Sequence, residues 1–307
     1  MKNDTKLSII ICTYNRCELL MKTLMSINKL KAIDSNEIEV LVVDNNSNDN
    51  TKEIVSECKE ILDYHLIYIL EQNQGLSYAR NTGIVRSQSS YIAFLDDDAI
   101  PSEDWAKIII ETFDNNPNIK SIGGPIEPNF EIDRPSWLSK DIEPLFTILN
   151  LGEKEIPFPS KRLPMGANMA FRKEVFKDIE FPIHLGRKGD SLISGEESWV
   201  FSQIKDLGVI YYCPKAKVKH FISKERLTKE WIKKRYINEG ISKAMGATTT
   251  IEKIKLFSIT ITKLIVVNLL DIFNNNNESV RLINKCRLMS YKSLLDSLLV
   301  KRVEKIK

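Results

Sequence analysis

The chain has 307 residues, 43% of them hydrophobic and 28% charged, a composition typical of a soluble globular protein with one large domain, or a domain with an appendage. Five cysteines, an odd number with no C-x-x-C pair, favour reduced core thiols in a cytosolic protein over a disulfide scaffold. The formal charge of +3 is the sum of an acidic part, residues 1–214, with 23 Lys and Arg against 33 Asp and Glu (net −10), and a basic part, residues 215–307, with 21 against 8 (net +13).

Neither the N-terminal residues nor the apolar segment 251–273 predicts an exported or membrane-spanning chain. Residues 1–6 are polar, and the apolar run that follows is too short for the hydrophobic region of a signal peptide. Residues 251–273 are strongly apolar, but Lys263 interrupts them and their apolar core is shorter than the roughly 20 residues that span a bilayer. We therefore expect a packed or interfacial helix there.

The first half of the chain alternates strands and helices. Apolar, β-branched runs predict strands at residues 7–13, 39–44, 65–71 and 91–98. Helical patterns follow each of them, from about residue 17, from Lys52, over Leu76 to Arg86, and from near Pro101 through Phe113. Strands and helices at this spacing indicate βαβ units and a parallel sheet with right-handed crossovers.

The second half has a different rhythm. A further strand ends at Gly123, and residues 128–164 are rich in loops, which is typical of a substrate loop or lid. Further elements are predicted at residues 165–171 (extended), 173–178 (a short helix), 195–207 (a helix after a glycine-bearing loop), 209–213 and 218–220 (short strands), and 227–246, 251–273 and 279–300 (helices), with a turn at 274–277.

Three carboxylates, Asp96, Asp97 and Asp98, end the apolar run that begins at Tyr91. Side chains alternate along an extended segment, so Asp96 and Asp98 are expected on one face and Asp97 on the other. Clustered carboxylates repel one another unless a cation or protons neutralise them, and oxygen ligands beside a substrate phosphate suit Mg²⁺ or Mn²⁺. The alternative is that the three residues cap the helix expected near Pro101.

Polar residues follow every strand of the first half. They are Thr13, Tyr14 and Asn15 after the first strand, Asp44 after the second, the loop 72–75 with Arg80 and Asn81 after the third, and the three Asp after the fourth. In open α/β sheets, ligands bind beyond the carboxyl ends of the strands. No Gly-x-Gly-x-x-Gly fingerprint and no Walker A loop is present, so these side chains would line a nucleotide site of another kind.

Six motifs then carry a family resemblance. SIIICTYNR, VVDNNSNDNT, NQGLSYARNTGI, FLDDDAIP, GANMAFRKEVF, and GEESW ahead of CPKAKVKH occur in this order over about residues 6–222. In them the chain resembles glycosyltransferase family 2, inverting sugar-nucleotide transferases of the GT-A fold. The resemblance implies an α/β fold with a Rossmann-like, mostly parallel sheet flanked by helices. We expect a catalytic domain at residues 1–223 and a basic helical C-terminal region at 224–307.

The resemblance also implies roles for individual residues. Thr13, Tyr14 and Asn15 would line the nucleoside pocket with Asp44, Arg80 would hold the nucleotide, and Asn73 and Gly75 would shape the loop beside it. Asp98 would bind the metal directly, with Asp96 nearer the ribose and sugar, Asp97 beside them, and His220 in a position that ligates metal in some members. Gly166, Ala167 and Asn168 would form the acceptor-side floor, and Glu197 stands where the family has its catalytic base.

One departure concerns that base. Many members have Glu-Asp where this chain has Glu196-Glu197, which makes the expected base one methylene longer and leaves Glu196 as the alternate. The chemistry implied is departure of a nucleoside diphosphate with a metal as Lewis acid. A carboxylate on the opposite face of the sugar removes the acceptor's proton.

We interpret the chain as a metal-assisted, inverting glycosyltransferase of cell-surface polysaccharide or glycoconjugate assembly, using a nucleotide-sugar donor and a glycan or lipid-linked glycan acceptor. A sugar nucleotidyltransferase is the alternative enzyme, although residues 13–20 are not the glycine-rich, basic loop it needs. An inactive membrane-surface binding module is the non-enzymatic alternative. The basic region suggests an anionic surface, lipid or nucleic acid, or a solvated helical tail. With this resemblance we expect no nucleic acid, and a cytoplasmic protein, peripheral at most on the inner face of the cell membrane.

Overall fold

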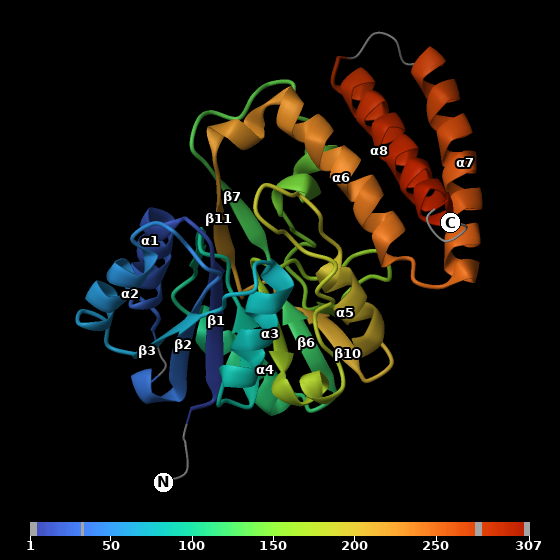
Figure 1. The fold of residues 1–307 in the computed structure, drawn as a ribbon. Coiled ribbons are helices and arrows are strands. Elements are labelled where there is room, and N and C mark those ends of the chain that lie inside the picture. The colour runs from blue at the N-terminus through green and yellow to red at the C-terminus, as the bar shows by residue number, and fades with distance from the viewer. Residues whose placement is uncertain (1–4, 32–33, 274–277, 304–307) are drawn as a thin grey trace. The chain divides into compact units, whose positions relative to one another are not determined.

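The computed structural model describes residues 5–31, 34–273 and 278–303. The chain divides into two compact units, which are described separately (Figure 1). The first unit consists of residues 1–129, 147–183 and 197–221, and the second of residues 130–146, 184–196 and 222–307. The whole first unit falls within the catalytic region expected at 1–223, but residues 130–146 and 184–196 of that region belong to the second unit. We keep the boundary after residue 223 as a proposal.

The elements follow one another in the order expected for alternating strands and helices. The strands are β1 Leu7–Thr13, β2 Ile38–Asp44, β3 His65–Leu70, β4 Tyr91–Phe94, β5 Ala99–Pro101, β6 Ile119–Gly123, β7 Ile126–Phe130, β8 Ile156–Pro157, β9 Met169–Arg172, β10 Val209–Tyr212 and β11 Val218–Ile222. The helices are α1 Cys17–Ile27, α2 Thr51–Lys59, α3 Leu76–Arg86, α4 Trp105–Asn115, α5 Glu196–Ile204, α6 Lys229–Gly246, α7 Thr250–Phe273 and α8 Glu278–Val303, with short 3-10 turns at Ser35–Glu37, Lys140–Phe146, Lys173–Lys177 and Lys224–Leu227.

A mostly parallel sheet of eight strands forms the centre of the first unit, in the order β3-β2-β1-β4-β9-β6-β10-β8. The strands β3, β2, β1 and β4 run parallel to one another, and β10 runs parallel to β6. Only β9, between β4 and β6, and the edge strand β8 are antiparallel to their neighbours. This is the GT-A class of sheet that the resemblance implies.

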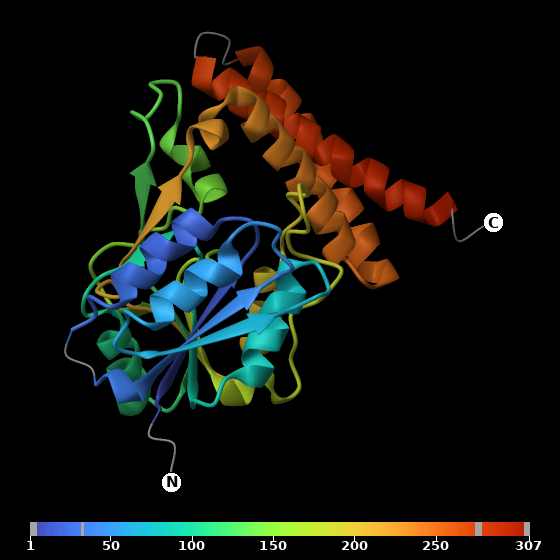
Figure 2. The ribbon, with the colours of Figure 1, turned by 60° about the vertical axis from the view of Figure 1, so that its left-hand side comes forward.

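Both faces of this sheet are covered by helices (Figures 1 and 2). Along β1, Ile9 and Ile11 point to a core shared with α1, α2 and α4, whereas Ile10 points to a core shared with α3 and α5. Strands buried on both sides read as continuous apolar runs. This is why the middle of β1 and of β2 is apolar, and their polar residues lie near the two ends, Ser8 and Thr13 in β1 and Glu39 and Asp44 in β2.

The strand registers bring the polar strand ends together. Thr13 lies opposite Asp44, and Asp44 opposite Leu70, so β1, β2 and β3 end level with one another. Strand β4 ends opposite Ile10, and the main-chain N–H of Leu95 still donates to the carbonyl of Ile10 at 3.1 Å. The carboxylates that follow therefore run along the carboxyl edge of the sheet.

The structure differs from the sequence predictions around the Asp triplet. The predicted strand 91–98 ends at Phe94, and the helix expected near Pro101 begins only at Trp105. Between them, Ala99–Pro101 forms a short strand of a second sheet, β5-β11-β7. The capping interpretation is therefore wrong, because a strand and a turn separate the triplet from α4, whose N-cap residue is Asp104. The short helix expected at 173–178 is a 3-10 turn.

The second unit contains the three C-terminal helices, at positions that confirm the predicted ones. Helix α8 packs against both α6 and α7, around Ala244, Leu294 and Leu298. At Gly240, an added Cβ would lie under 3.0 Å from the carbonyl of Ser290, so the approach of α6 to α8 requires glycine. The turn predicted at 274–277 lies outside the described residues. Among the residues that the structure describes, no helix is both long and apolar enough to cross a membrane.

Candidate active site

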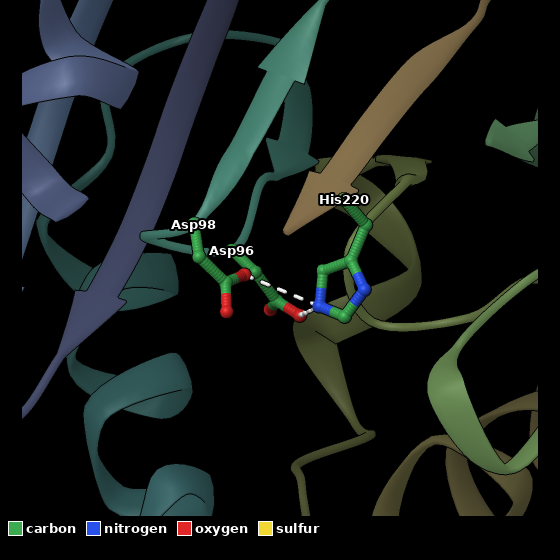
Figure 3. Close-up of side chains that lie close together, drawn as sticks. All are labelled: Asp96, Asp98 and His220. Atoms are coloured by element: carbon green, nitrogen blue, oxygen red, sulfur yellow. Dashed lines mark ion pairs between the residues drawn. The ribbon is translucent and has the colours of Figure 1, made fainter. Parts of the chain in front are cut away.

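Two carboxylates and an imidazole converge at the carboxyl edge of the central sheet (Figure 3). The Nε2 atom of His220 lies 3.2 Å from Asp98 Oδ1 and 4.0 Å from Asp96 Oδ2. One ligand atom from each of the three residues lies within 4.8 Å of the others. Asp98 and His220 are buried, whereas the Asp96 side chain is 35% exposed, so the cluster is open on the side of Asp96.

The small sheet explains why His220 meets the triplet. Strand β11 pairs antiparallel with β5, which places His220 opposite Ala99, the residue directly after Asp98. The N–H of Phe221 donates to the carbonyl of Asp98 at 2.9 Å and fixes this register. The metal set expected from the sequence, Asp96, Asp98 and His220, is thus brought together by backbone pairing.

The middle carboxylate, Asp97, is not part of the metal set and has other partners. The alternation expected of an extended strand does not apply here, because β4 ends at Phe94 and Asp97 and Asp98 lie in a turn. Asp97 accepts hydrogen bonds from Thr13 Oγ1 at 2.8 Å and from Arg16 Nη1 at 2.7 Å. Burial raises the pKa of Asp97, while the positive charge of Arg16 opposes that rise. The other nitrogen of the fork, Nη2, pairs with Asp98 Oδ2 at 2.7 Å. Arg16 therefore binds two of the three carboxylates.

The sequence analysis named no role for Arg16. Its position could have indicated a role at the site, because Arg16 follows the polar strand end Thr13-Tyr14-Asn15 and precedes α1. In a parallel sheet such a residue lies near the ends of the neighbouring strands.

The three residues fit a divalent metal. Asp98 uses Oδ2 for Arg16 and presents Oδ1 to His220, so one carboxylate oxygen faces the cluster. Two carboxylates and one imidazole are ligand types that first-row divalent metals accept. Arg16 neutralises one of the three negative charges, and a divalent cation would balance the other two.

The residues expected around the nucleoside form a connected set. Asp44 is buried and accepts from Tyr68 Oη at 2.7 Å and from the N–H of Ser47 at 2.9 Å. Tyr14, which follows Thr13 in the sequence, is half-buried. Asn15 has φ of 53° and accepts a hydrogen bond from the N–H of Asn48 at 2.7 Å. Tyr68 is a partner of Asp44 that the sequence analysis did not single out.

The loop between β3 and α3 is held from β2. Asn45 donates through Nδ2 to the carbonyl of Asn73 at 2.8 Å and accepts from the N–H of Gly75 at 2.6 Å. Gly75 has φ of 144°, a backbone conformation that L side chains rarely adopt. Asn45, which was not predicted from the sequence, thus fixes the loop that contains Asn73 and Gly75. The place of this loop beside a nucleotide stays a prediction.

The Arg80 side chain is buried and forms an ion pair with Glu197, the expected catalytic base. Its side chain is 3% exposed, and Nη2 pairs with Glu197 Oε1 at 3.1 Å. The guanidinium lies 5.1 Å from the ring centre of Phe181 and 5.8 Å from that of Phe94, within range of cation–π attraction. The prediction that Arg80 holds the nucleotide stays a prediction, and the contact with Glu197 adds a second role.

Gly166 lies against this ion pair. A Cβ at Gly166 would come under 3.0 Å from Arg80 Nη2 and 2.7 Å from Glu197 Oε1, distances that real Cβ atoms essentially never show. An alanine here would therefore displace the end of one or both side chains of the pair.

The remaining predicted site residues differ in how accessible they are. Glu196 is buried, whereas the Glu197 side chain is 22% exposed, so Glu197 is the neighbour that a solute can reach. The Asn168 side chain is buried and accepts from Trp105 Nε1 while donating to the carbonyls of Pro125 and Ala216. Its hydrogen bonds therefore hold Asn168 to three separate segments, and the acceptor-side floor expected at 166–168 stays a prediction.

Together, a mostly parallel sheet and an Asp-x-Asp cluster with a histidine at its carboxyl edge define a class of protein, the GT-A glycosyltransferases. The model of "Glycosyl transferase family 2" matches residues 8–180, which is more than half of the chain. The chain belongs to glycosyltransferase family 2 and is a glycosyltransferase.

Curated relatives include two archaeal proteins and one bacterial protein. The glucosyl-dolichyl phosphate glucuronosyltransferase of Haloferax volcanii is 26% identical over 243 residues, 78% of this chain and 76% of the relative. Glycosyltransferase AglE of the same organism is 33% identical over 60% of this chain and 58% of its own length. Succinoglycan biosynthesis protein ExoM of Rhizobium meliloti is 25% identical over 78% of this chain and 75% of its own.

Solved structures share the fold. The mannosyltransferase PcManGT of Pyrobaculum calidifontis, in complex with GDP-Man and Mn²⁺, superposes with a TM-score of 0.64 at 17% identity, covering 96% of this chain and 88% of that one. TarS of S. aureus gives a TM-score of 0.53 at 20% identity, covering 76% of this chain and 40% of that one. At these identities the likeness concerns the fold alone.

Proposed function

We propose that the chain transfers a sugar from a nucleotide-sugar donor to a hydroxyl of a glycan or lipid-linked glycan, with inversion at the anomeric carbon. One observation carries the proposal. Thr13 lies opposite Asp44, the expected nucleoside carboxylate, and donates to Asp97, the centre of the Asp triplet. The nucleoside and the diphosphate of one donor would thus bind at neighbouring strand ends of the same sheet.

Each residue then has a separate task at the diphosphate. Asp96, Asp98 and His220 would hold a divalent metal, which when bound supplies a Lewis acid against the negative charge of the departing diphosphate. Arg16 adds a fixed positive charge beside the same carboxylates. Because Asp98 and His220 are buried, this charge compensation takes place in surroundings where electrostatic interactions are stronger than in water.

Glu197 is the proposed general base. Its carboxylate is paired with Arg80, and such a pair requires the ionised form, which is the form that accepts a proton. Arg80 is fixed by burial and by its two aromatic neighbours, so we propose that it also orients Glu197. A sugar hydroxyl is a poor nucleophile, and placement of the base against it matters more than the strength of the base.

Mn²⁺ is the ion we propose over Mg²⁺. The set contains an imidazole nitrogen beside two carboxylates, and Mg²⁺ is bound mainly through oxygen and water. The related fold of PcManGT was solved with Mn²⁺ and GDP-Man, which supports a metal-dependent use of a nucleotide sugar.

The names of the relatives support a lipid-linked or polysaccharide acceptor. One is a glucosyl-dolichyl phosphate glucuronosyltransferase and another a succinoglycan biosynthesis protein. We propose that this chain acts in cell-surface glycoconjugate assembly from the cytoplasmic side, peripheral on the membrane through its basic C-terminal helices. Nucleic acid is not a proposed partner.

Product analysis tests the proposal. The protein with Mn²⁺ is offered a panel of sugar nucleotides, and release of nucleoside diphosphate with free or transferred sugar is expected for one of them. Release of pyrophosphate, or synthesis of a sugar nucleotide from a sugar phosphate, would indicate a nucleotidyltransferase instead. Binding without any turnover across donors and metals would indicate an inactive binding module.

A further inference from the structure

Helix α7 is apolar on two opposite faces. On one face, Thr260 and Val267 are buried and Leu256 packs with the α6–α8 core described above. On the other face the large apolar side chains are exposed: Ile251 (78%), Ile254 (56%), Phe257 (38%), Ile259 (42%), Ile261 (38%), Ile265 (56%), Val266 (47%) and Leu269 (52%). We call these eight residues the α7 stripe.

The α7 stripe is helical in its spacing. Ile251, Ile254, Ile261, Ile265 and Leu269 recur at intervals of three, seven, four and four, which places them along one side of the helix. At 1.5 Å per residue the stripe is about 27 Å long. Lys255, Ser258 and Thr262 are exposed on the same side, so the stripe is an apolar surface interrupted by polar groups. A concentration of exposed apolar side chains often marks a binding surface.

The stripe also stands out within the molecule. Of the nineteen large apolar side chains that are exposed among the described residues, eight lie on this one helix. Single exposed apolar residues elsewhere need no explanation, but a concentration of this kind indicates a surface that is covered in use.

Charge indicates what covers it. Between Ile251 and Leu269 the helix has three lysines, Lys253, Lys255 and Lys263, and one acidic residue, Glu252. The region 215–307 has a net charge of +13. A second copy of the same surface would bring like charges together, which is unfavourable at low salt. An anionic lipid bilayer offers both an apolar interior and negative headgroups.

We propose that the α7 stripe docks on an anionic membrane, with α7 lying in the plane of the interface and its apolar side chains inserted among the lipids. The helix lies on the bilayer because no described helix can span it. Lys255 and Lys263 extend their aliphatic stems along the apolar surface and keep their ammonium groups at the headgroups. The apolar side chains supply the main binding energy, and the lysines add an electrostatic part.

This inference deepens the proposed function, since it places the protein where a lipid-linked acceptor resides. Its test needs no activity. The full-length protein is mixed with phosphatidylcholine vesicles containing about 30 mol% phosphatidylglycerol, a content chosen to give an anionic surface, and flotation is measured. The variant Ile254→Ser/Ile261→Ser/Ile265→Ser removes three exposed side chains from the stripe. The matched control, Ile61→Ser/Val85→Ser/Leu207→Ser, removes three side chains that are 57%, 77% and 51% exposed in the first unit.

The expected result is that the wild type and the control float, while the stripe variant loses at least about tenfold in its partition coefficient, because each lost side chain removes buried apolar area. At about 0.5 M salt, charge is screened, and the difference between wild type and stripe variant should remain. Equal flotation of the stripe variant, or no flotation of the wild type, would overturn the proposal. A wild-type dimer that the stripe variant abolishes, without vesicle binding, would assign the stripe to a second copy.

Donor hydrolysis without vesicles separates this inference from the proposed function. The stripe variant should hydrolyse its donor at the wild-type rate, because no residue of the stripe belongs to the active site. If no variant and no wild type turns over any donor, the proposed function fails while the flotation result still decides the membrane proposal.

Discussion

The carboxyl edge of the central sheet and the outer face of α7 are opposites in their chemistry. At the sheet edge, ionisable groups such as Asp97, Asp98 and His220 are buried and held by neighbours from distant parts of the chain. On α7, the α7 stripe exposes apolar groups that the fold itself does not cover. Buried charge and exposed apolar surface are both unfavourable for stability alone. Each therefore points to a ligand, one charged and one lipid.

The largest effect is expected at the charged end of this comparison. Asp98→Ala removes the residue shared by Arg16 and His220, and transfer should fall by about 10³-fold or more, since Lewis-acid stabilisation is worth several kcal/mol. Mn²⁺-dependent donor binding should disappear as well. The measurement is donor turnover and calorimetric binding with and without Mn²⁺, with the exposed Asp206→Ala as control. Turnover retained in excess EDTA would contradict a metal role.

Glu197→Gln tests the base next. The change keeps the shape of the side chain and removes its basicity, so transfer should fall by roughly 10²-fold or more while donor binding stays normal. Single-turnover transfer and a donor binding curve check both parts. Glu196→Gln is the matched neighbour, and if that variant shows the loss instead, the base has been assigned to the wrong residue.

Gly166→Ala asks whether the Arg80–Glu197 pair positions the base. The new methyl group would force both partners apart, and misplacement of a catalytic group by about 1 Å can cost about 10²-fold. We expect kcat to fall by about 10- to 100-fold with little change in KM for the donor. Gly246→Ala serves as control, because nothing lies within 4 Å of its added Cβ. Equal kcat in the two variants would show that the pair does not set the geometry of the base.

The next prediction concerns the stability of the second unit, which contains the α7 stripe. Gly240→Ala inserts a methyl group against the carbonyl of Ser290 and should destabilise the helical unit by about 1–3 kcal/mol, the usual range for overpacking. Gly246→Ala, with open space around it, should be neutral or slightly stabilising, since alanine restricts the unfolded chain. Thermal or urea unfolding followed by circular dichroism measures both. A loss of stability in both variants would mean that helix packing is not the cause.

The smallest effect is expected for single charges near the α7 stripe. Lys255→Gln should weaken binding to anionic vesicles by only a few fold, because one basic residue near such a surface contributes about 1 kcal/mol and salt screens it. Flotation at low and high salt gives the comparison. A loss as large as that of the Ile254→Ser/Ile261→Ser/Ile265→Ser variant would mean that charge, and not apolar area, dominates the docking.

Local patterns made much of the fold predictable. The β-branched runs of β1 and β2 and their polar ends are visible in the sequence, and parallel pairing then brings Thr13 and Asp44 level. Asp96 and Asp98 do lie together beside His220, but not through strand alternation, because β4 ends at Phe94. What a single sequence does not reveal is which distant segments meet.

The missing parts of the site are long-range contacts. Strand β5 has three residues, too few to show a pattern, yet its pairing with β11 places His220 against Asp98. Arg80 and Glu197 are 117 positions apart, and their meeting depends on how α3 and α5 cover one face of the sheet. Arg16 reaches Asp97 and Asp98 across 81 and 82 positions. Such contacts follow from tertiary packing, which propensity and periodicity do not encode.

The fork of Arg16 has a consequence for how the protein matures. With one guanidinium on Asp97 and Asp98, the most buried part of the cluster has an internal counter-ion. In many metalloproteins the folding free energy depends on ion supply, because ligand charges repel one another until the ion arrives. In this protein Arg16 supplies part of the compensating positive charge, so folding depends less on the ion. Newly made protein should therefore reach its native state in metal-poor surroundings. Chelation should remove its activity and lower its melting temperature, but should not unfold it, because only the binding free energy of the ion is lost.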